Sequence, residues 1–211
     1  MGQVRRVGLT GGIATGKSAV ARVLSERHGI PVLDADRFAR EALAQGGEAS
    51  RAVLRRYGDA VRAAPSSAGD SSVDRAALAR IVFGDEVERQ WLEQLVHPMV
   101  RARYAAELER LAGVPVVVLM IPLLFEAGLE PLCSEIWVVD CGSEAEQLRR
   151  LQDRDRLTAT EAEARLRAQW PMAAKLARAD VVIHNSGPLP SLVAQVDAAL
   201  GHPPRVAQGG R

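Results

Sequence analysis

The chain has 211 residues, 47% of them apolar and 25% charged, which is typical of a globular protein and excludes wholesale disorder. Its 27 Lys and Arg residues balance 26 Asp and Glu residues, so bulk charge predicts no nucleic-acid partner. No apolar run is long enough to span a membrane, and the first residues lack a secretion signal. The only two cysteines, Cys133 and Cys141, lack metal-ligand spacing, so we expect a protein of the reducing cytoplasm.

Short β-branched runs alternate with helical patterns along the chain. Strands are predicted at residues 4–10, 31–33, 114–121, 136–140 and 181–184. Helices are predicted at residues 17–28, 36–44, 48–111, 144–170 and 189–200. This order predicts an α/β fold with a five-stranded parallel sheet flanked by helices. Long insertions follow the second and fourth strands, a polar loop is expected at residues 64–72, and residues 201–211 are expected to form a flexible tail.

Residues 11–18 read GGIATGKS and match the phosphate-loop pattern G-x-x-x-x-G-K-[ST] between a predicted strand and a predicted helix. Glycines let backbone N–H groups converge on an anion, and the helix dipole adds positive potential. Lys17 would reach the β- and γ-phosphates of ATP, and Ser18 would bind Mg²⁺. The alternative is a glycine-rich turn with an exposed lysine. The predicted nucleotide-binding residues are Gly11, Gly12, Ile13, Ala14, Thr15, Gly16, Lys17 and Ser18.

Lysine is rare in this chain. Among the Lys and Arg residues only Lys17 and Lys175 are lysines, which we interpret as a bias of genome composition. A single arginine therefore carries little information, whereas a lysine that is retained against the bias carries more. This argues for a function of Lys17.

Two carboxylates follow the second predicted strand, where open parallel sheets bind their ligands. Asp34 could accept the proton of an attacking hydroxyl or hold a Mg²⁺-bound water, or it could only cap a loop. Asp36 precedes a helical pattern and is interpreted mainly as its N-cap, with a water-mediated contact to Mg²⁺ as the alternative.

Two absences and one cluster narrow the class of phosphate-loop protein. The third predicted strand ends without an aspartate, and the chain has no Asn-Lys-x-Asp tetrapeptide for guanine, so a small-molecule kinase is favoured over a switch. Arg150 and Arg154 share a helix face in an arginine-rich stretch and are predicted to close over the γ-phosphate as part of a lid. The alternative is a solvated helix face.

Five segments together resemble the dephospho-coenzyme A kinase family: residues 8–18, 32–36, 95–98, 121–126 and 179–187. The first is generic, but the five in this order are specific. The resemblance implies a P-loop kinase that uses ATP to phosphorylate the ribose 3′-hydroxyl of dephospho-CoA, the last step of coenzyme A synthesis. It also implies domain boundaries. These are a nucleotide-binding core at residues 1–34, 112–142 and 179–200, an acceptor domain at 35–111 and a lid at 143–178.

The resemblance also implies residue roles. Asp34 would be the base, and Arg150 and Arg154 would be lid residues. Asn185 and Gly187 would lie against adenine. The acceptor side would be lined by His97, Leu123, Phe125 and Glu126. From the residues alone, His97 could equally be packed inside a helix before Pro98, and the two apolar residues could be only core.

The sequence departs from the family pattern at three positions. His184 replaces a usual Asp, Arg156 a frequent Gly, and Trp170 a smaller residue such as Met. These changes bear on lid geometry and adenine contacts and remove no group that the chemistry requires. The expected partners are ATP, Mg²⁺ and dephospho-CoA, without an obligate protein partner. A kinase for another hydroxyl acceptor, such as a nucleoside monophosphate, and a non-catalytic nucleotide switch are the alternatives.

Overall fold

The computed structural model describes residues 4–63 and 72–202 of the chain. The expected tail beyond residue 202 and the expected loop at residues 64–71 lie outside the described residues. The chain divides into two compact units, one of residues 1–34 and 111–211 and the other of residues 35–110. Within the described part, no helix is both long enough and apolar enough to cross a membrane.

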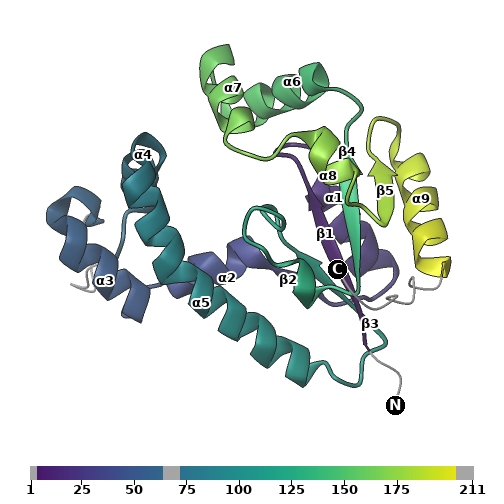
Figure 1. Ribbon diagram of the computed structural model, residues 1–211, viewed down its shortest axis with the longest axis horizontal. Coiled ribbons are helices and arrows are strands. Elements are labelled where there is room, and N and C mark those ends of the chain that lie inside the picture. Colours follow the sequence, from purple (N-terminus) through teal and green to yellow (C-terminus); the bar gives the residue numbers. More distant parts are fainter. Residues whose placement is uncertain (1–3, 64–71, 203–211) are drawn as a thin grey trace. The chain divides into compact units, whose positions relative to one another are not determined.

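Among the described residues of the first unit, five parallel strands form a single sheet in the order β2-β3-β1-β4-β5 (Figure 1). The predicted fold class is therefore confirmed. Parallel neighbours need crossover connections, and here these are the helices that the apolar periodicity predicts. The strands are β1 (Arg5–Gly11), β2 (Val32–Asp34), β3 (Val116–Met120), β4 (Glu135–Asp140) and β5 (Val181–His184).

The main core lies between this sheet and two helical segments. One is α1 (Lys17–Arg22), which continues in a π-helical turn (Val23–Arg27), and the other is α9 (Leu189–Gly201), which lies beside β5 in Figure 1. Trp137, Leu24 and Val196 are fully buried in the shared cluster. Gly201 is the last residue of α9, so the prediction that the tail begins there is wrong by one residue.

Arg5 ties the first strand to the last helix. Its largely buried guanidinium forms an ion pair with Glu135 on β4. It also donates to the carbonyl oxygens of Leu200 at 2.8 Å and Ala199 at 3.1 Å. A cation is favourable there, because the carbonyls at the end of a helix carry partial negative charge. The contact fixes the position of α9 against the sheet.

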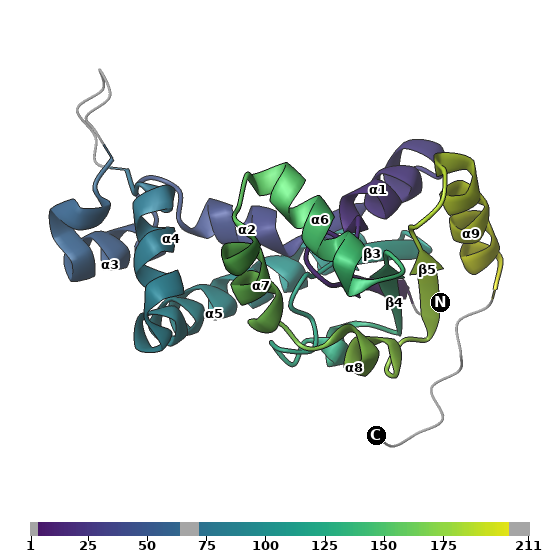
Figure 2. The same cartoon turned by 90° about the horizontal axis from the view of Figure 1, so that it is seen from above.

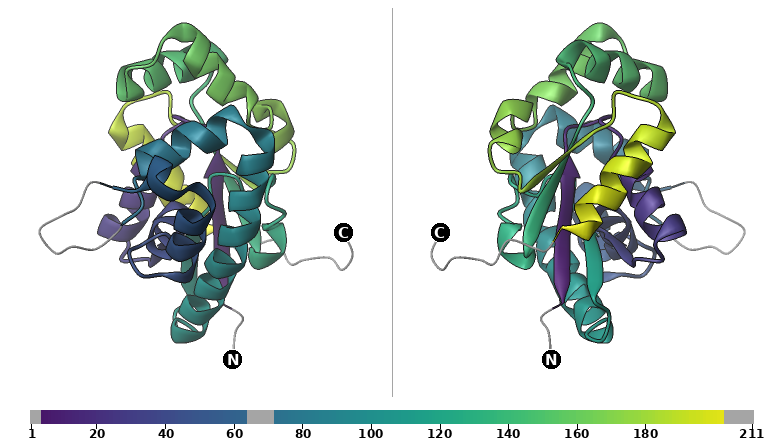
Figure 3. Two further views of the ribbon diagram at one scale, coloured as in Figure 1. Left: turned by 90° about the vertical axis from the view of Figure 1, so that its left-hand side faces the viewer. Right: turned by 90° about the vertical axis from the view of Figure 1, so that its right-hand side faces the viewer.

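The connection between β4 and β5 contains three helices, α6 (Glu144–Asp155), α7 (Ala159–Arg167) and α8 (Met172–Leu176). The first two lie near the carboxyl ends of the strands (Figure 3). The sequence predicted one helical region at residues 144–170, but the chain turns at Arg156, which adopts a left-handed conformation with φ of 57°. Thr158 then caps α7 and forms a reciprocal capping box with Glu161.

The second unit is helical. Figure 2 shows α3 and α4 near one end of the long helix α5, and α2 packs on α5 through an edge-to-face contact of Phe38 with Tyr104, whose ring centroids lie 5.1 Å apart. Val53 and Leu78 anchor a separate apolar cluster. The elements are α2 (Ala35–Ala42), α3 (Glu48–Tyr57), a 3₁₀ turn (Gly58–Val61), α4 (Arg75–Gly84) and α5 (Glu86–Arg110).

We expect Arg156→Gly to stabilise the protein by about 0.5–1 kcal/mol. The left-handed conformation costs a residue with a Cβ atom roughly 1–2 kcal/mol, and glycine avoids this cost. Part of the stabilisation is lost again, because glycine gives the unfolded chain more conformational entropy. Urea unfolding followed by circular dichroism measures the change. The control, Ala164→Gly at an exposed position inside α7, should lose up to about 1 kcal/mol. Equal destabilisation by the two glycines would contradict the strain argument.

Candidate active site

The phosphate loop, residues 11–18, connects the end of β1 to the start of α1. Gly16 precedes α1 in a left-handed conformation, with φ of 98°, and no side chain caps the helix. The amino end of the helix therefore keeps its backbone donors and positive potential for an anion. A Cβ atom at Gly16 would also collide with the amide nitrogen of Asn185, so glycine is required there for two independent reasons.

Lys17 folds along the loop in this structure. Its Nζ donates to the carbonyl oxygens of Gly11 at 3.0 Å and Gly12 at 2.6 Å. These bonds hold the ammonium group over the loop, from which it can turn toward a bound phosphate. Ser18 is exposed in the first turn of α1.

Asp34 is the last residue of β2 and pairs in register with Met120 on β3. It therefore lies at the same edge of the sheet as the phosphate loop, because parallel strands end together. The interpretation of Asp36 as an N-cap is wrong. The helix α2 already begins at Ala35, so Asp36 lies inside its first turn, where its negative charge complements the helix dipole.

The two predicted lid arginines have different surroundings. Arg150 is partly buried, pairs with Glu146 at 2.7 Å and donates to the carbonyl oxygen of Asn185 at 2.9 Å. Arg154 is more exposed and pairs with Asp155 at 2.7 Å. They lie on one helix, but they do not converge on a common point in this structure, because each is held by a different acidic neighbour.

These ion pairs also set the protonation of the acidic partners. Hydrogen bonds from Arg149 and Arg150 lower the pKa of Glu146 to about 2. A hydrogen bond from Arg154 likewise lowers the pKa of Asp155. Both carboxylates therefore remain charged at neutral pH, and any movement of an arginine toward ATP must break a formed ion pair.

Asn185 lies against the phosphate loop. Its side-chain amide donates to the carbonyl oxygen of Thr15 at 2.9 Å, and its backbone N–H donates to the backbone carbonyl oxygen of Asp140 at 2.7 Å. Gly187 is exposed in the turn that follows β5. His184, the first departure from the family pattern, is also exposed, and its ring lies 3.5 Å from the Asp140 carboxylate.

The segment after β3 is fixed by a buried ion pair. Glu126 lies 2.7 Å from the ammonium of Lys175, whose side chain is fully buried, and accepts a bond from the backbone N–H of Trp170 at 3.0 Å. Phe125 is buried and stacks on Trp170 with ring centroids 5.9 Å apart. The guanidinium of Arg178 lies 5.1 Å from the Trp170 ring. Leu123 is partly exposed beside this cluster, at 36%.

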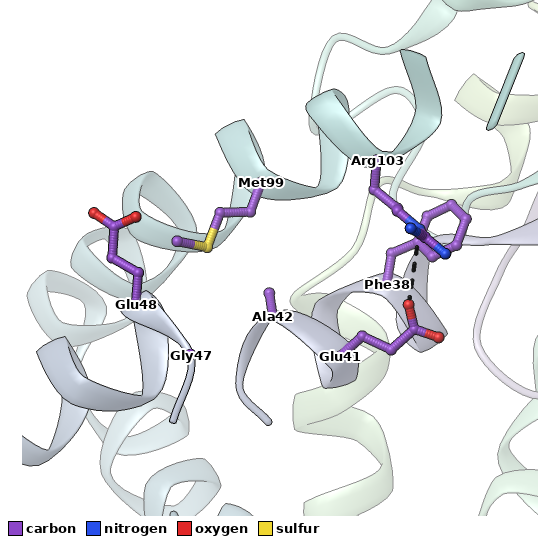
Figure 4. Close-up of a pocket in the computed structure, with 7 residues that line it drawn as sticks. All are labelled: Phe38, Glu41, Ala42, Gly47, Glu48, Met99 and Arg103. Atoms are coloured by element: carbon purple, nitrogen blue, oxygen red, sulfur yellow. Dashed lines mark ion pairs between the residues drawn. The ribbon is translucent and has the colours of Figure 1, made fainter. Parts of the chain in front are cut away.

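The second unit holds His97 and a pocket. His97 is half-buried on α5, directly before Pro98 inside the helix. The pocket has a volume of about 370 Å³. Figure 4 shows Arg103 above the Phe38 ring and paired with Glu41 at 3.9 Å. The lining residues, which do not include His97, are Phe38, Glu41, Ala42, Gly47, Glu48, Met99 and Arg103.

Sequence reasoning missed four side chains that surround these predicted residues. Lys175 carried a signal, since it is one of two lysines retained in an arginine-rich chain. Gln147, Gln169 and Met172 carried none, yet all three contact the phosphate loop. Their contacts join residues more than 130 positions apart, which no local pattern reveals.

The sequence profile of the dephospho-CoA kinase family matches residues 5–191. A dephospho-CoA kinase from Synechococcus sp. (strain CC9605) is 58% identical over 183 residues, which cover 87% of this chain and 86% of that protein. The chain belongs to the dephospho-CoA kinase family. The matched range includes the phosphate loop, Asp34 and the predicted lid segment.

Solved structures agree with the family assignment. A crystal structure of a Thermus thermophilus protein has 38% identity and a TM-score of 0.78, covering 94% of this chain and 97% of that one. A dephospho-CoA kinase from Campylobacter jejuni has 25% identity and a TM-score of 0.67, covering 92% of this chain and 94% of that one. The fold is therefore similar to that of a solved dephospho-CoA kinase over nearly the whole chain.

We expect Gly16→Ala to weaken ATP binding roughly tenfold or more. An alanine at this φ is strained by about 1–3 kcal/mol, and its methyl group collides with Asn185. Isothermal titration calorimetry with a non-hydrolysable ATP analogue measures the dissociation constant. Gly113→Ala is the control, since an added methyl group meets no atom within 4 Å there and φ lies outside the left-handed region. Equal affinity in the two variants would contradict the requirement for glycine.

Proposed function

We propose that this chain transfers the γ-phosphoryl group of ATP to the ribose 3′-hydroxyl of dephospho-CoA, which completes coenzyme A synthesis. The observation that carries the proposal is the family match, because it spans the phosphate loop, the strand end at Asp34 and the segments at residues 95–98 and 121–126 in one continuous alignment. The two free cysteines, whose thiol pKa values are raised by burial, support a cytoplasmic location.

In this proposal the phosphate loop binds ATP through its backbone N–H groups and the amino end of α1. Lys17 leaves its carbonyl partners and contacts the β- and γ-phosphates. Asn185 and Gly187 are assigned to the adenine side, where Asn185 already contacts the loop.

The donor set suits Mg²⁺. Among the described residues, no group of three or more His, Cys, Asp or Glu side chains could enclose a metal ion. Mg²⁺ in kinases instead keeps several waters and takes phosphate oxygens as ligands. Ser18 would supply one ligand directly and Asp34 another through water. When bound, the ion neutralises charge on the β- and γ-phosphates.

Asp34 is assigned as the general base. Its carboxylate accepts the proton of the 3′-hydroxyl while the hydroxyl oxygen bonds to the γ-phosphorus. The bond from that phosphorus to the β–γ bridging oxygen breaks, and ADP leaves with the electron pair. Charge builds up on the transferring group, and Arg150 and Arg154 are assigned to offset it once their side chains leave Glu146 and Asp155 for the nucleotide.

Acceptor contacts are assigned to His97, Leu123, Phe125 and Glu126. Glu126 has an additional argument. One of its carboxylate oxygens is used by Lys175 and Trp170, and the other is buried without a hydrogen-bond partner among the described residues. A buried acceptor of this kind is costly unless a donor reaches it, and a hydroxyl or amide of the acceptor substrate would supply one.

An acceptor panel tests the proposed function. ADP release is measured by a coupled assay with dephospho-CoA, with nucleoside monophosphates and without acceptor. Release only with dephospho-CoA supports the proposal. Release with a nucleotide would assign the chain to a different small-molecule kinase, and slow release that does not depend on any acceptor would indicate a nucleotide switch.

We expect Lys17→Ala to lower kcat roughly 10³-fold or more, because it removes a charge that stabilises the transferring phosphoryl group. It also removes two hydrogen bonds within the loop, so a stability loss of about 1 kcal/mol is expected. The control, Arg22→Ala, removes an exposed charge from the end of the same helix and should retain activity. A folded Lys17→Ala variant with normal turnover would exclude the loop from the reaction.

We expect Asp34→Asn to lower kcat by roughly 10²–10⁴-fold, since an amide cannot accept the proton. The dissociation constant for ATP should change much less, because the phosphate loop supplies most of the contacts. Steady-state kinetics and separate binding titrations distinguish the two effects. Lost ATP affinity with kcat preserved would make Asp34 a metal anchor, and a larger loss in Asp36→Asn would move the base assignment to Asp36.

A further inference from the structure

Both polar groups of one phosphate-loop residue are held by glutamine side chains. The backbone N–H of Ile13 donates to Oε1 of Gln169 at 2.9 Å, and Nε2 of Gln147 donates to the Ile13 carbonyl oxygen at 2.7 Å. The neighbouring N–H of Gly12 donates to the sulfur of Met172 at 3.2 Å. We call Gln147, Gln169 and their bonds to Ile13 the glutamine clamp.

The clamp approaches from both ends of one helical segment. Gln147 lies in the first turns of α6, and Gln169 lies in the link between α7 and α8 (Figure 1). The chain between them contains Arg150 and Arg154, which are assigned to the γ-phosphate above. The segment that carries these arginines is therefore attached to the phosphate loop at its beginning and at its end.

Gly12 shows how closely the clamp approaches. Its φ lies outside the left-handed region, so the backbone conformation does not itself require glycine. A Cβ atom at this position would instead collide with Nε2 of Gln147 and lie 2.9 Å from the Met172 sulfur. The clamp therefore leaves space for a side chain at Gly12 only if Gln147 and Met172 shift.

The clamp is well suited to hold backbone rigidly. Gln147 is only 2% exposed, and a hydrogen bond in such surroundings is stronger than one in water. Each glutamine matches the group that it meets, since an amide oxygen accepts from an N–H and an amide nitrogen donates to a carbonyl. Breaking the bond from Gln147 would leave its buried amide nitrogen without this partner.

We propose that Gln147 and Gln169 are positioning residues for phosphoryl transfer, which hold the backbone on both sides of Ile13 in its ATP-binding conformation and couple nucleotide binding to the order of the α6–α7 segment. The proposal rests on the proposed function for the reaction itself. Neither glutamine is assigned a contact with substrate. Both act through the backbone of the loop, and ATP bound to that loop favours the clamped arrangement of α6 and α7.

The chain offers a closely matched control. Gln195 on α9 makes the same pair of bonds with another residue: it accepts from the N–H of His184 at 2.8 Å and donates to the His184 carbonyl oxygen at 2.9 Å. Among the described residues, the side chain of Gln195 makes its hydrogen bonds to His184 and Ser191 and none to the phosphate loop. Replacement by methionine keeps the length of the side chain; it removes the one bond that Gln147 or Gln169 makes to Ile13, and both bonds that Gln195 makes to His184.

The experiment compares Gln147→Met, Gln169→Met, the double variant and Gln195→Met. The dissociation constant of an ATP analogue, kcat, the free energy of unfolding, and trypsin cleavage after Arg154 and Arg156 with and without the analogue are measured. We expect each clamp variant to weaken binding about tenfold and to lose the protection that the nucleotide gives against trypsin. We expect the double variant to resemble the single variants, because the two bonds restrain adjoining peptide groups on either side of one residue and are therefore coupled. Gln195→Met should keep wild-type binding and protection.

Three results would overturn the proposal. Clamp variants that lose only unfolding free energy, with wild-type binding, kcat and protection, would make the glutamines purely structural. If Gln195→Met weakened ATP-analogue binding and trypsin protection as much as the clamp variants do, the effect would not be specific to bonds with the phosphate loop. Fully multiplicative losses in the double variant would mean that the two bonds act independently. Binding and proteolysis need no acceptor, so these readouts hold even if the acceptor panel contradicts the proposed function.

Discussion

The first unit depends on holding a short stretch of backbone open at the end of β1. A phosphate site built from backbone N–H groups works only if those groups converge on one point. The loop backbone must therefore be held in a conformation in which its N–H groups point inward. Here Gly16 takes a conformation that few residues tolerate, and Asn185 packs against it. The first half of the loop is held by side chains. Lys17 donates to the Gly12 carbonyl oxygen, and Gln147 and Gln169 bond to the carbonyl oxygen and the N–H of Ile13.

The surroundings of the loop show that its preorganisation comes from distant parts of the chain. Asn185 follows β5, and its side chain and main chain connect the loop to Arg150 on α6. The buried pair of Lys175 and Glu126 connects the segment after β3 to the same helical region. Removing one partner of such a pair leaves an uncompensated buried charge. These contacts make the predicted nucleotide, lid and acceptor segments of this unit mechanically dependent on one another.

Two arginines of α6 form ion pairs with acidic residues of the same helix. Arg150 and Arg154 are bound to acidic neighbours whose lowered pKa values keep them ionised. A bound triphosphate carries enough negative charge to compete for these guanidiniums, whereas water does not. The ion pairs therefore hold each arginine on its acidic neighbour, and in the proposed reaction the guanidiniums exchange these partners for the nucleotide.

The sequence by itself determined the elements whose signal is local. The run GGIATGKS between a strand and a helix predicted the phosphate loop, the β-branched runs predicted all five strands, and the order of motifs identified the family. A pattern that involves consecutive residues can be read without knowing the fold. The boundaries failed where a single residue decides them: Arg156 ends α6 by adopting a left-handed conformation, and α2 begins one residue before the expected cap at Asp36.

Only the tertiary structure decided which side chains support the site. Ile13 meets glutamines 134 and 156 positions away, and Glu126 meets a lysine from a short helix that the periodicity did not predict. Glutamine has no distinctive spacing when its partner is backbone, because any residue offers the same N–H and carbonyl groups. These contacts exist because parallel strands require long crossovers, which return distant helices to the edge of the sheet where the loop lies.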